Sequence, residues 1–189
     1  MTPSLVAANS SKKVWWRCHN GHEWQASIGN RNRGHGCIYC SNQKVLPGYN
    51  DLATSRPDIA KEWHPTKNYP LLPSEVTCGS EKKVWWKCDK GHEWIASVKS
   101  RSKGTGCPYC ANRKVLTGYN DLASINPRLA KEWHPTKNLP LTPQMVCANS
   151  NIKLWWLCEN GHTWEAKIDN RNKGTKCPLC AKNPHKKLN

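Results

Sequence analysis

The chain has no phenylalanine and only 2 methionines among its 189 residues, so a core must be built mainly from aliphatic side chains and its 11 tryptophans. It has no apolar run near the ~20 residues that cross a membrane, and its first residues lack the apolar segment of a secretory signal. These absences exclude a membrane-spanning helix and predict a soluble protein.

Acidic residues are also scarce, because 13 Asp and Glu stand against 29 Lys and Arg. The formal net charge is +16, and nine thiolates binding three Zn²⁺ would lower it by three, to +13. A charge of this size favours a polyanionic partner, most often nucleic acid, although a basic surface without a partner would give the same count.

Cysteine is abundant, and nine of the 11 cysteines fall into three groups of identical spacing, seventy residues apart. Each group has a Cys-x3-His pair and, fourteen residues later, a Cys-x2-Cys pair. Two short ligand pairs joined by a loop are typical of a tetrahedral zinc site, and thiolate and imidazole suit zinc better than hard cations. Disulfides are the competing interpretation. The spacing predicts three structural Zn²⁺ ions, with the ligands Cys18, His22, Cys37, Cys40, Cys88, His92, Cys107, Cys110, Cys158, His162, Cys177 and Cys180.

The two remaining cysteines, Cys78 and Cys147, do not occupy equivalent positions of the repeat. A disulfide between them and two unrelated free thiols are both possible, and the second is favoured. Thiols spaced for zinc indicate a reducing compartment, so we expect the protein in the cytoplasm or the nucleus.

A module of about 45 residues buries too little apolar surface to fold unaided, so a metal at its centre is physically expected. The repeat predicts a small zinc-stabilised α+β fold: three tandem zinc-ribbon or treble-clef-like modules, each a β-hairpin plus a short helix, joined by helical connectors. The expected boundaries are zinc module 1 at 1–47, connector 1 at 48–70, zinc module 2 at 71–117, connector 2 at 118–140, and zinc module 3 with a basic tail at 141–189.

Within the first module, residues 14–18 and 23–28 are predicted strands flanking the first ligand pair, and residues 29–36 a glycine-bounded loop. In the first connector, Asn50 or Asp51 can cap a short helix, and Pro57 fits the first turn of a second. Apolar residues on these helices, Trp63 among them, share one face. We therefore expect each connector to pack against a zinc module.

The motifs resemble a known family. Val-Trp-Trp-x-Cys-x-x-Gly-His-x-Trp, Cys-Pro-x-Cys and a connector with Asn-Asp-Leu-Ala and Glu-Trp-His-Pro-x-Lys-Asn are similar to tandem zinc-ribbon, treble-clef-like domains of unknown function. Ile38 replaces proline in the first Cys-x-x-Cys, and Leu154 replaces valine before the third tryptophan pair. The resemblance implies the fold and suggests nucleic-acid association, but brings no catalytic reaction.

Two features bear on function. Each predicted first strand carries adjacent tryptophans, whose rings point to opposite faces. One ring can cover the zinc core. The other must face a connector, a neighbouring module or a ligand such as a base.

Each loop before the second ligand pair carries two cations at equivalent positions, as expected of phosphate contacts, although simple solubility would also require cations. The predicted nucleic-acid-binding residues are Arg31, Arg33, Arg101, Lys103, Arg171 and Lys173.

His64 and His134 lie in the Trp-His-Pro-Thr-Lys-Asn segments and raise a nuclease hypothesis, since histidine can activate water. No second histidine or carboxylate cluster accompanies either one, and a histidine at a helix end is the simpler explanation. The sequence alone thus favours a nucleic-acid-binding zinc protein that is not an enzyme. The alternative is a scaffold subunit of a larger ribonucleoprotein or nuclease complex.

Overall fold

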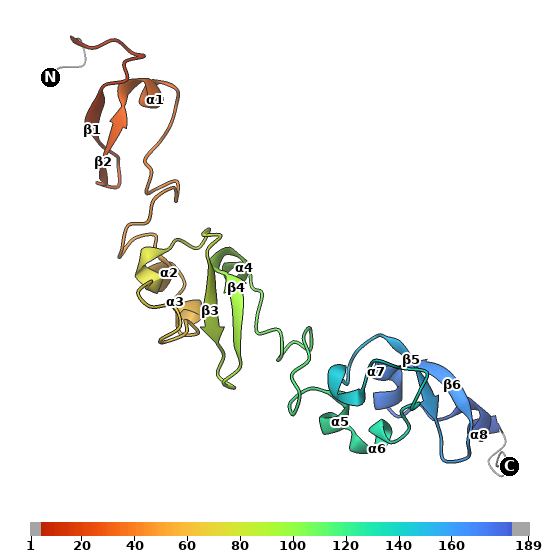
Figure 1. Ribbon diagram of the computed structural model, residues 1–189. Coiled ribbons are helices and arrows are strands. Elements are labelled where there is room, and N and C mark those ends of the chain that lie inside the picture. The colour runs from red at the N-terminus through yellow and green to blue at the C-terminus, as the bar shows by residue number, and fades with distance from the viewer. Residues whose placement is uncertain (1–4, 183–189) are drawn as a thin grey trace. The chain divides into compact units, whose positions relative to one another are not determined.

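The structure is a computed structural model that describes residues 5–182. The chain forms two compact units, residues 1–105 and 106–189, and each is considered by itself (Figure 1). No helix among the described residues is long and apolar enough to cross a membrane.

Each module contains one antiparallel hairpin of two five-residue strands, close to the predicted bounds. In every hairpin the second tryptophan of the adjacent pair faces a tryptophan on the return strand, as Trp16 faces Trp24. The strands are β1 Lys13–Arg17, β2 Glu23–Ser27, β3 Lys83–Lys87, β4 Glu93–Ser97, β5 Lys153–Leu157 and β6 Thr163–Lys167.

The segment predicted as a glycine-bounded loop begins instead with a short helix directly after each hairpin. In the first module Ser27 ends its strand and also caps this helix, because its side chain accepts a hydrogen bond from the Asn30 backbone N–H. Composition does not show that the last residue of a strand also caps a helix. The sequence therefore does not predict this helix. The helices are α1 Ile28–Asn32, α4 Val98–Ser102 and α7 Ile168–Asn172.

The connectors contain the two predicted short helices. Asp51 caps the first helix by accepting from the Thr54 N–H, and Pro57 opens the second, as expected. In the second connector the Asn126 side chain accepts from the Leu129 N–H. The connector helices are α2 Leu52–Ser55, α3 Pro57–Ala60, α5 Leu122–Ile125 and α6 Pro127–Ala130. The remaining described elements are two short 3-10 helices, η2 Pro73–Glu75 and η3 Pro143–Met145, and the last helix, α8 Pro178–Lys182.

The connectors pack on the hairpin that follows them, which confirms that they are not free linkers. In Figure 1, α2 and α3 lie beside β3. In the second unit, Leu122 and Leu129 of the connector are buried in one core with Trp156 of the hairpin and Ile168 of α7. The equivalent Leu52 and Ile59 are buried in the first unit.

The segment after each connector helix pair also lies along the outer edge of the next hairpin, where Trp63 forms a β-bridge with Trp86. The His64 N–H donates to the Trp85 carbonyl at 3.1 Å, and the Lys87 N–H donates to the Glu62 carbonyl at 2.7 Å. The second connector repeats these bonds on β5. Each connector therefore forms an isolated β-bridge on the outer edge of the two-stranded hairpin after it.

This packing predicts unequal effects for two apolar residues of the second connector. Leu129→Ala removes a side chain that is 5% exposed, and it should lower the free energy of unfolding of the third module by ~2–5 kcal/mol. Ile125→Ala changes a side chain that is 53% exposed, and it should stay within about 0.5 kcal/mol of the wild type. Amide hydrogen exchange at Trp156 measures both free energies; equal losses would show that the connector does not support the hairpin.

Candidate metal centres and the basic turns

The structure brings the predicted ligands together in three groups, each of three cysteines and one histidine, with all ligand atoms of a group within 4.8 Å of one another. Among residues 5–182 these are the groups of three or more such side chains that could hold a metal ion. They are Cys18, His22, Cys37 and Cys40; Cys88, His92, Cys107 and Cys110; and Cys158, His162, Cys177 and Cys180.

The separations fit zinc. Tetrahedral zinc with its usual Zn–S and Zn–N bond lengths gives S···S edges of about 3.8 Å and S···N edges of about 3.5 Å. In the first module Cys18 Sγ lies 3.8 Å from Cys40 Sγ, and His22 Nδ1 lies 3.5, 3.3 and 3.7 Å from the sulfurs of Cys18, Cys40 and Cys37. The third module has the corresponding values of 3.7 Å and of 3.5, 3.2 and 3.7 Å. Nδ1 is therefore the histidine ligand atom in both groups.

The first ligand pair of each module sits on a tight turn between the strands. The Cys18 N–H donates to the His22 carbonyl at 3.1 Å, and the Gly21 N–H donates to the Cys18 carbonyl at 2.9 Å. Gly21 has φ of 81°, a left-handed conformation that side chains disfavour, and Gly91 and Gly161 repeat it. The hairpin turn thus positions the first ligand pair of each site.

Neighbouring polar groups lie against the ligand sulfurs, and at Cys40 they stabilise the thiolate form. The Asn20 side-chain amide lies 3.4 Å from Cys40 Sγ, and Asn160 lies 3.3 Å from Cys180 Sγ. Burial raises the pKa of the Cys40 thiol, but hydrogen bonds from Asn20, Tyr49 and His22 outweigh it and lower this pKa to about 6. A thiol that ionises readily is a good zinc ligand, and such surrounding donors tune the ligands.

The two cysteines outside the groups are free thiols. Cys147 is buried, and burial raises the pKa of its thiol, as does the charge of Asp121. Cys78 is half-buried.

The predicted phosphate contacts divide into two classes. Arg101 and Arg171 do not point outward: each is 5% exposed and lies over the rings of two tryptophans of its own hairpin. Arg101 forms an ion pair with Glu62 at 2.6 Å, and Arg171 forms one with Glu132. Each guanidinium also donates to the backbone carbonyl four residues later, that of Thr105 or Thr175. The expectation of outward-facing cations is wrong at these two positions, because connector carboxylates and aromatic rings hold the guanidinium groups inside.

Three further cations of these turns are exposed, and Arg31 is not among them. Arg33, Lys103 and Lys173 are the C-cap residues of α1, α4 and α7, and each precedes a glycine with positive φ. Arg31 is half-buried: it donates to the His35 carbonyl and lies over Trp16 and Trp24.

The histidines of the nuclease hypothesis have structural contacts. His64 is 5% exposed, its Nδ1 accepts from the Thr66 and Lys67 N–H groups, and its Nε2 lies 3.0 Å from Glu93 Oε1. Hydrogen bonds from Lys67 and His64 lower the pKa of Glu93 to about 2. His134 Nδ1 accepts the equivalent two backbone bonds. Nδ1 of His64 is thus occupied by two backbone N–H groups, and its buried Nε2 faces the Glu93 carboxylate.

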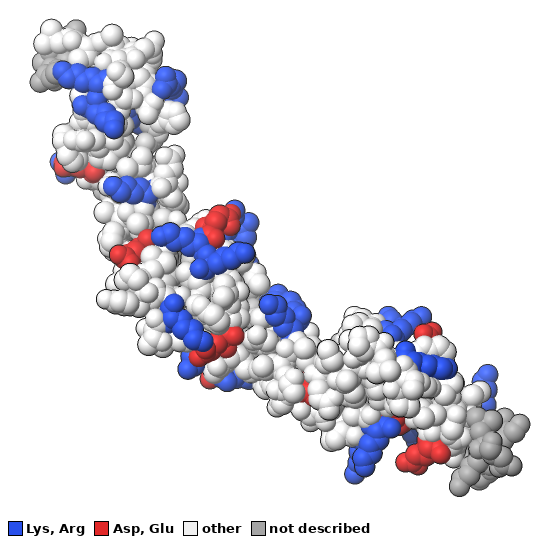
Figure 2. Space-filling view, viewed as in Figure 1, with Lys and Arg blue, Asp and Glu red and all other residues white. Residues whose placement is uncertain are grey.

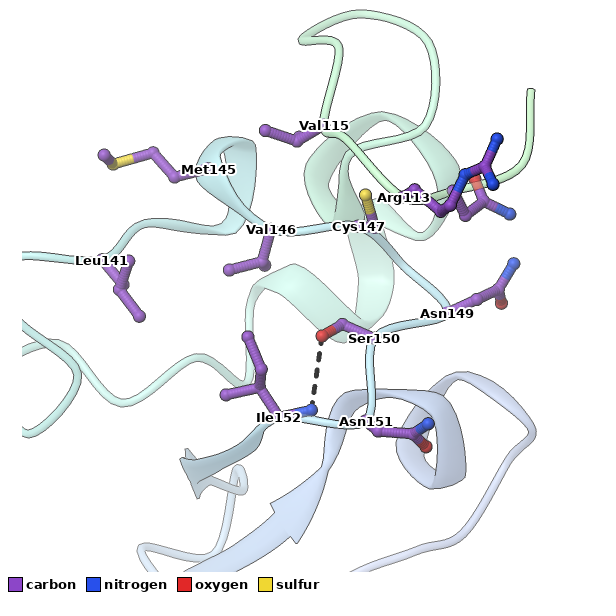
Figure 3. Close-up of a pocket in the computed structure, with 11 residues that line it drawn as sticks. Arg113, Val115, Leu141, Met145, Val146, Cys147, Asn149, Ser150, Asn151 and Ile152 are labelled. Carbon is purple, nitrogen blue, oxygen red and sulfur yellow. Dashed lines mark hydrogen bonds between the residues drawn. The ribbon is translucent and has the colours of Figure 1, made fainter. Parts of the chain in front are cut away.

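A pocket of about 410 Å³ lies in the second unit (Figure 3). Leu141, Val146 and Ile152 give it apolar walls, while Arg113 and Asn149 add polar groups. The backbone at Ile152 is held by a hydrogen bond from its N–H to Ser150 Oγ at 3.3 Å. No sequence motif pointed to this pocket, since its walls come from segments that are distant in the chain.

The chain matches the family described as "Probable Treble clef zinc finger domain" three times, over residues 1–43, 59–113 and 129–183. The chain belongs to this family. The second and third matches begin inside the connectors, which agrees with the packing of each connector on the hairpin that follows.

One curated relative is a protein of Escherichia phage T5 named "Putative endonuclease". It is 24% identical over 136 residues, which cover 69% of this chain and 44% of the relative. The chain thus spans less than half the length of this relative.

This relative corrects the expectation that the protein is not an enzyme. That expectation rested on the absence of a recognisable catalytic cluster in the sequence. The relative is named as an endonuclease, which is an enzyme.

Proposed function

We propose that the three zinc modules bind nucleic acid, and that the exposed cations at the ends of α1, α4 and α7 contact its phosphates. The observation that carries this proposal is the recurrence of an exposed cation, Arg33, Lys103 or Lys173, at the same C-cap position in all three modules. Phosphate contacts from such positions set the register of a protein on nucleic acid without reading the bases.

The inward-pointing arginines support this proposal indirectly. Arg101 donates to the Thr105 carbonyl and Arg171 to the Thr175 carbonyl, so each guanidinium ties down the turn on which Lys103 or Lys173 stands. A cation on a fixed turn loses less conformational entropy on binding than one on a loose loop. Arg101 and Arg171 are therefore assigned to holding the turns, and phosphate contact is assigned to their exposed neighbours.

The charge of the surface agrees with this role. Figure 2 shows Lys and Arg on all three modules, with fewer Asp and Glu on the same face. Glu23 is the one acidic residue within residues 5–47. The same segment carries exposed cations at Lys12, Lys13 and Arg33. The lysine side chain of the ion pair between Lys173 and Asp169 is exposed. Replacing the Asp169 carboxylate by a phosphate as the partner of Lys173 therefore costs little free energy.

The pocket of the second unit adds a site for more than phosphate. Its apolar walls and the guanidinium and amide groups of Arg113 and Asn149 suit the face and edge of a nucleobase. This composition favours contact with an unpaired base.

Salt dependence tests the assignment. Replacing Arg33, Lys103 and Lys173 together with Ala should reduce the slope of log K against log salt on duplex DNA by up to about 2.7, because each phosphate contact contributes ~0.9. The loss should be similar for unrelated sequences. Fluorescence anisotropy with a labelled duplex at several salt concentrations measures it.

A triple variant of Lys61, Arg128 and Lys131 to Ala removes the same charge from exposed connector positions and is the matched control. If the control lowers the slope as much as the turn variant, net charge explains binding and the turns have no special role. If the wild-type chain binds neither DNA nor RNA by itself, the scaffold alternative replaces this proposal.

A second candidate, endonuclease activity, is favoured by the name of the phage relative. The zinc sites have four protein ligands each, which leaves no open position for a reacting water. Cleavage by this chain would therefore use another divalent ion.

The test is nicking of supercoiled plasmid with Mg²⁺ or Mn²⁺, with and without chelator. An endonuclease should nick only with the added ion, and chelator should abolish the nicking. Absence of metal-dependent nicking would remove this candidate.

A further inference from the structure

A carboxylate on the middle hairpin is surrounded by basic side chains. His64 Nε2 lies 3.0 Å from Glu93 Oε1, and Lys87 Nζ lies 3.8 Å from the same oxygen. The ammonium group of Lys67 forms an ion pair with Glu93 Oε2 and lies over the ring of Trp85. The connector residues His64 and Lys67 therefore hold an anion against the face of the hairpin that carries Trp85.

The third hairpin keeps the two connector residues of this arrangement. The His134 N–H donates to the Trp155 carbonyl at 3.2 Å, where the middle hairpin has 3.1 Å. His134 Nδ1 accepts from the N–H groups of Thr136 and Lys137 at 3.4 and 3.3 Å. Lys137 Nζ lies 3.8 Å from the centroid of the Trp155 ring, close to the 4.2 Å of the lysine and tryptophan in the middle hairpin. The connector histidine and lysine are therefore placed alike on the two hairpins.

The carboxylate is missing from the third hairpin. Thr163 opens β6 at the position where Glu93 opens β4, and its side chain is neutral, shorter and exposed. His134 is half-buried, whereas His64 behind its glutamate is 5% exposed. Among residues 5–182 His134 Nε2 has no hydrogen-bond acceptor, and Lys137 has no carboxylate within ion-pair distance. No described carboxylate therefore fills the place of the anion on this hairpin.

The hydrogen bonds at Nδ1 decide which ring nitrogen of His134 carries the proton. Because two backbone N–H groups donate to Nδ1, this nitrogen is an acceptor, and the ring proton lies on Nε2. His134 thus presents an N–H donor where His64 meets its carboxylate. The imidazole is neutral in this state, so the positive charge beside it comes from Lys137.

The other charges on this face of the third hairpin leave it positive. Leu157 replaces the second lysine that surrounds the carboxylate of the middle hairpin, so one cation is lost with the anion. Strand alternation places Lys153, Lys167 and Glu165 on the same face as Trp155. Together with the connector lysine, three cations face one carboxylate, and within the described part of the chain Glu165 forms no ion pair.

We propose that the Nε2–H of His134 and the ammonium group of Lys137 bind a phosphate group, in the place where the middle hairpin holds its own carboxylate. Both anions offer charged oxygens that accept charge-assisted hydrogen bonds. The net charge of +16 favours a phosphate of a polyanion over a single carboxylate as the ligand.

For a phosphate of nucleic acid, this inference rests on the proposed function and adds a contact on the face of the third hairpin. Free phosphate has the same chemistry, so the experiment has one arm for each source.

The test follows the imidazole resonances of the full zinc-loaded chain by NMR, with isotope-labelled histidine. The chain is titrated at constant ionic strength with inorganic phosphate and, separately, with a short duplex DNA. The Nε2 resonance of His134 should shift in both arms. That of His64 should not shift with phosphate, because Glu93 occupies its anion position.

Thr163→Glu supplies the carboxylate of the middle hairpin and should weaken phosphate binding at His134 at least about tenfold, because it takes the place of the ligand. Glutamate opens the second strand of the other two hairpins, at Glu23 and Glu93, so the fold accommodates it. Asn170→Glu adds the same charge at an exposed position of α7 and is the matched control, which should stay within about twofold of the wild type.

The site is overturned if His134 responds to neither phosphate nor DNA, if chloride shifts its resonance as much as phosphate does, or if the two glutamate variants weaken binding equally. If His134 is silent while the duplex still binds, the site fails and the proposed nucleic-acid binding stands. A response to inorganic phosphate without one to DNA supports the site and identifies free phosphate as its ligand.

Discussion

Tetrahedral coordination by three thiolates and one imidazole is the constraint on which every module depends. The hairpins have five residues per strand and the helices after them five residues, lengths that are marginal without tertiary support. Zinc joins the hairpin turn to a second ligand pair that lies beyond the helix, so the metal closes a loop that the small core could not close alone. The fit of the sulfur and nitrogen separations to a zinc tetrahedron shows that the peptide geometry is already suited to the ion.

The connector is the second source of stability, and it acts through the guanidinium of an inward-pointing arginine. Arg101 lies between Trp86 and Trp94, ties down its own turn through the Thr105 carbonyl, and pairs with Glu62 of the connector. Connector, hairpin and turn are therefore held by one buried side chain. Trp16 of the first module, which no described connector residue covers, is partly exposed, as this arrangement implies.

Much of the metal site could be predicted from the sequence, because ligand chemistry and ligand spacing are local. The connector caps at Asp51 and Asn126 were predictable for the same reason. The direction in which Arg101 points was not, since its partner Glu62 lies 39 residues away and only the folded connector brings the two together. The pocket beside Arg113 is likewise formed by segments that are remote in sequence. The expectation that the protein is not an enzyme failed for a different reason. A missing motif in one sequence says little about catalysis, whereas the phage relative is named as an endonuclease.

X-ray absorption at the zinc edge, on protein whose metal content has been measured, tests the central claim most directly. We predict three zinc ions per chain, each with three sulfur neighbours at about 2.3 Å and one nitrogen neighbour at about 2.0–2.1 Å. A first shell of four sulfurs, a shell with oxygen ligands, or a content of one zinc or none would contradict the assignment of the ligands and the account of folding built on it.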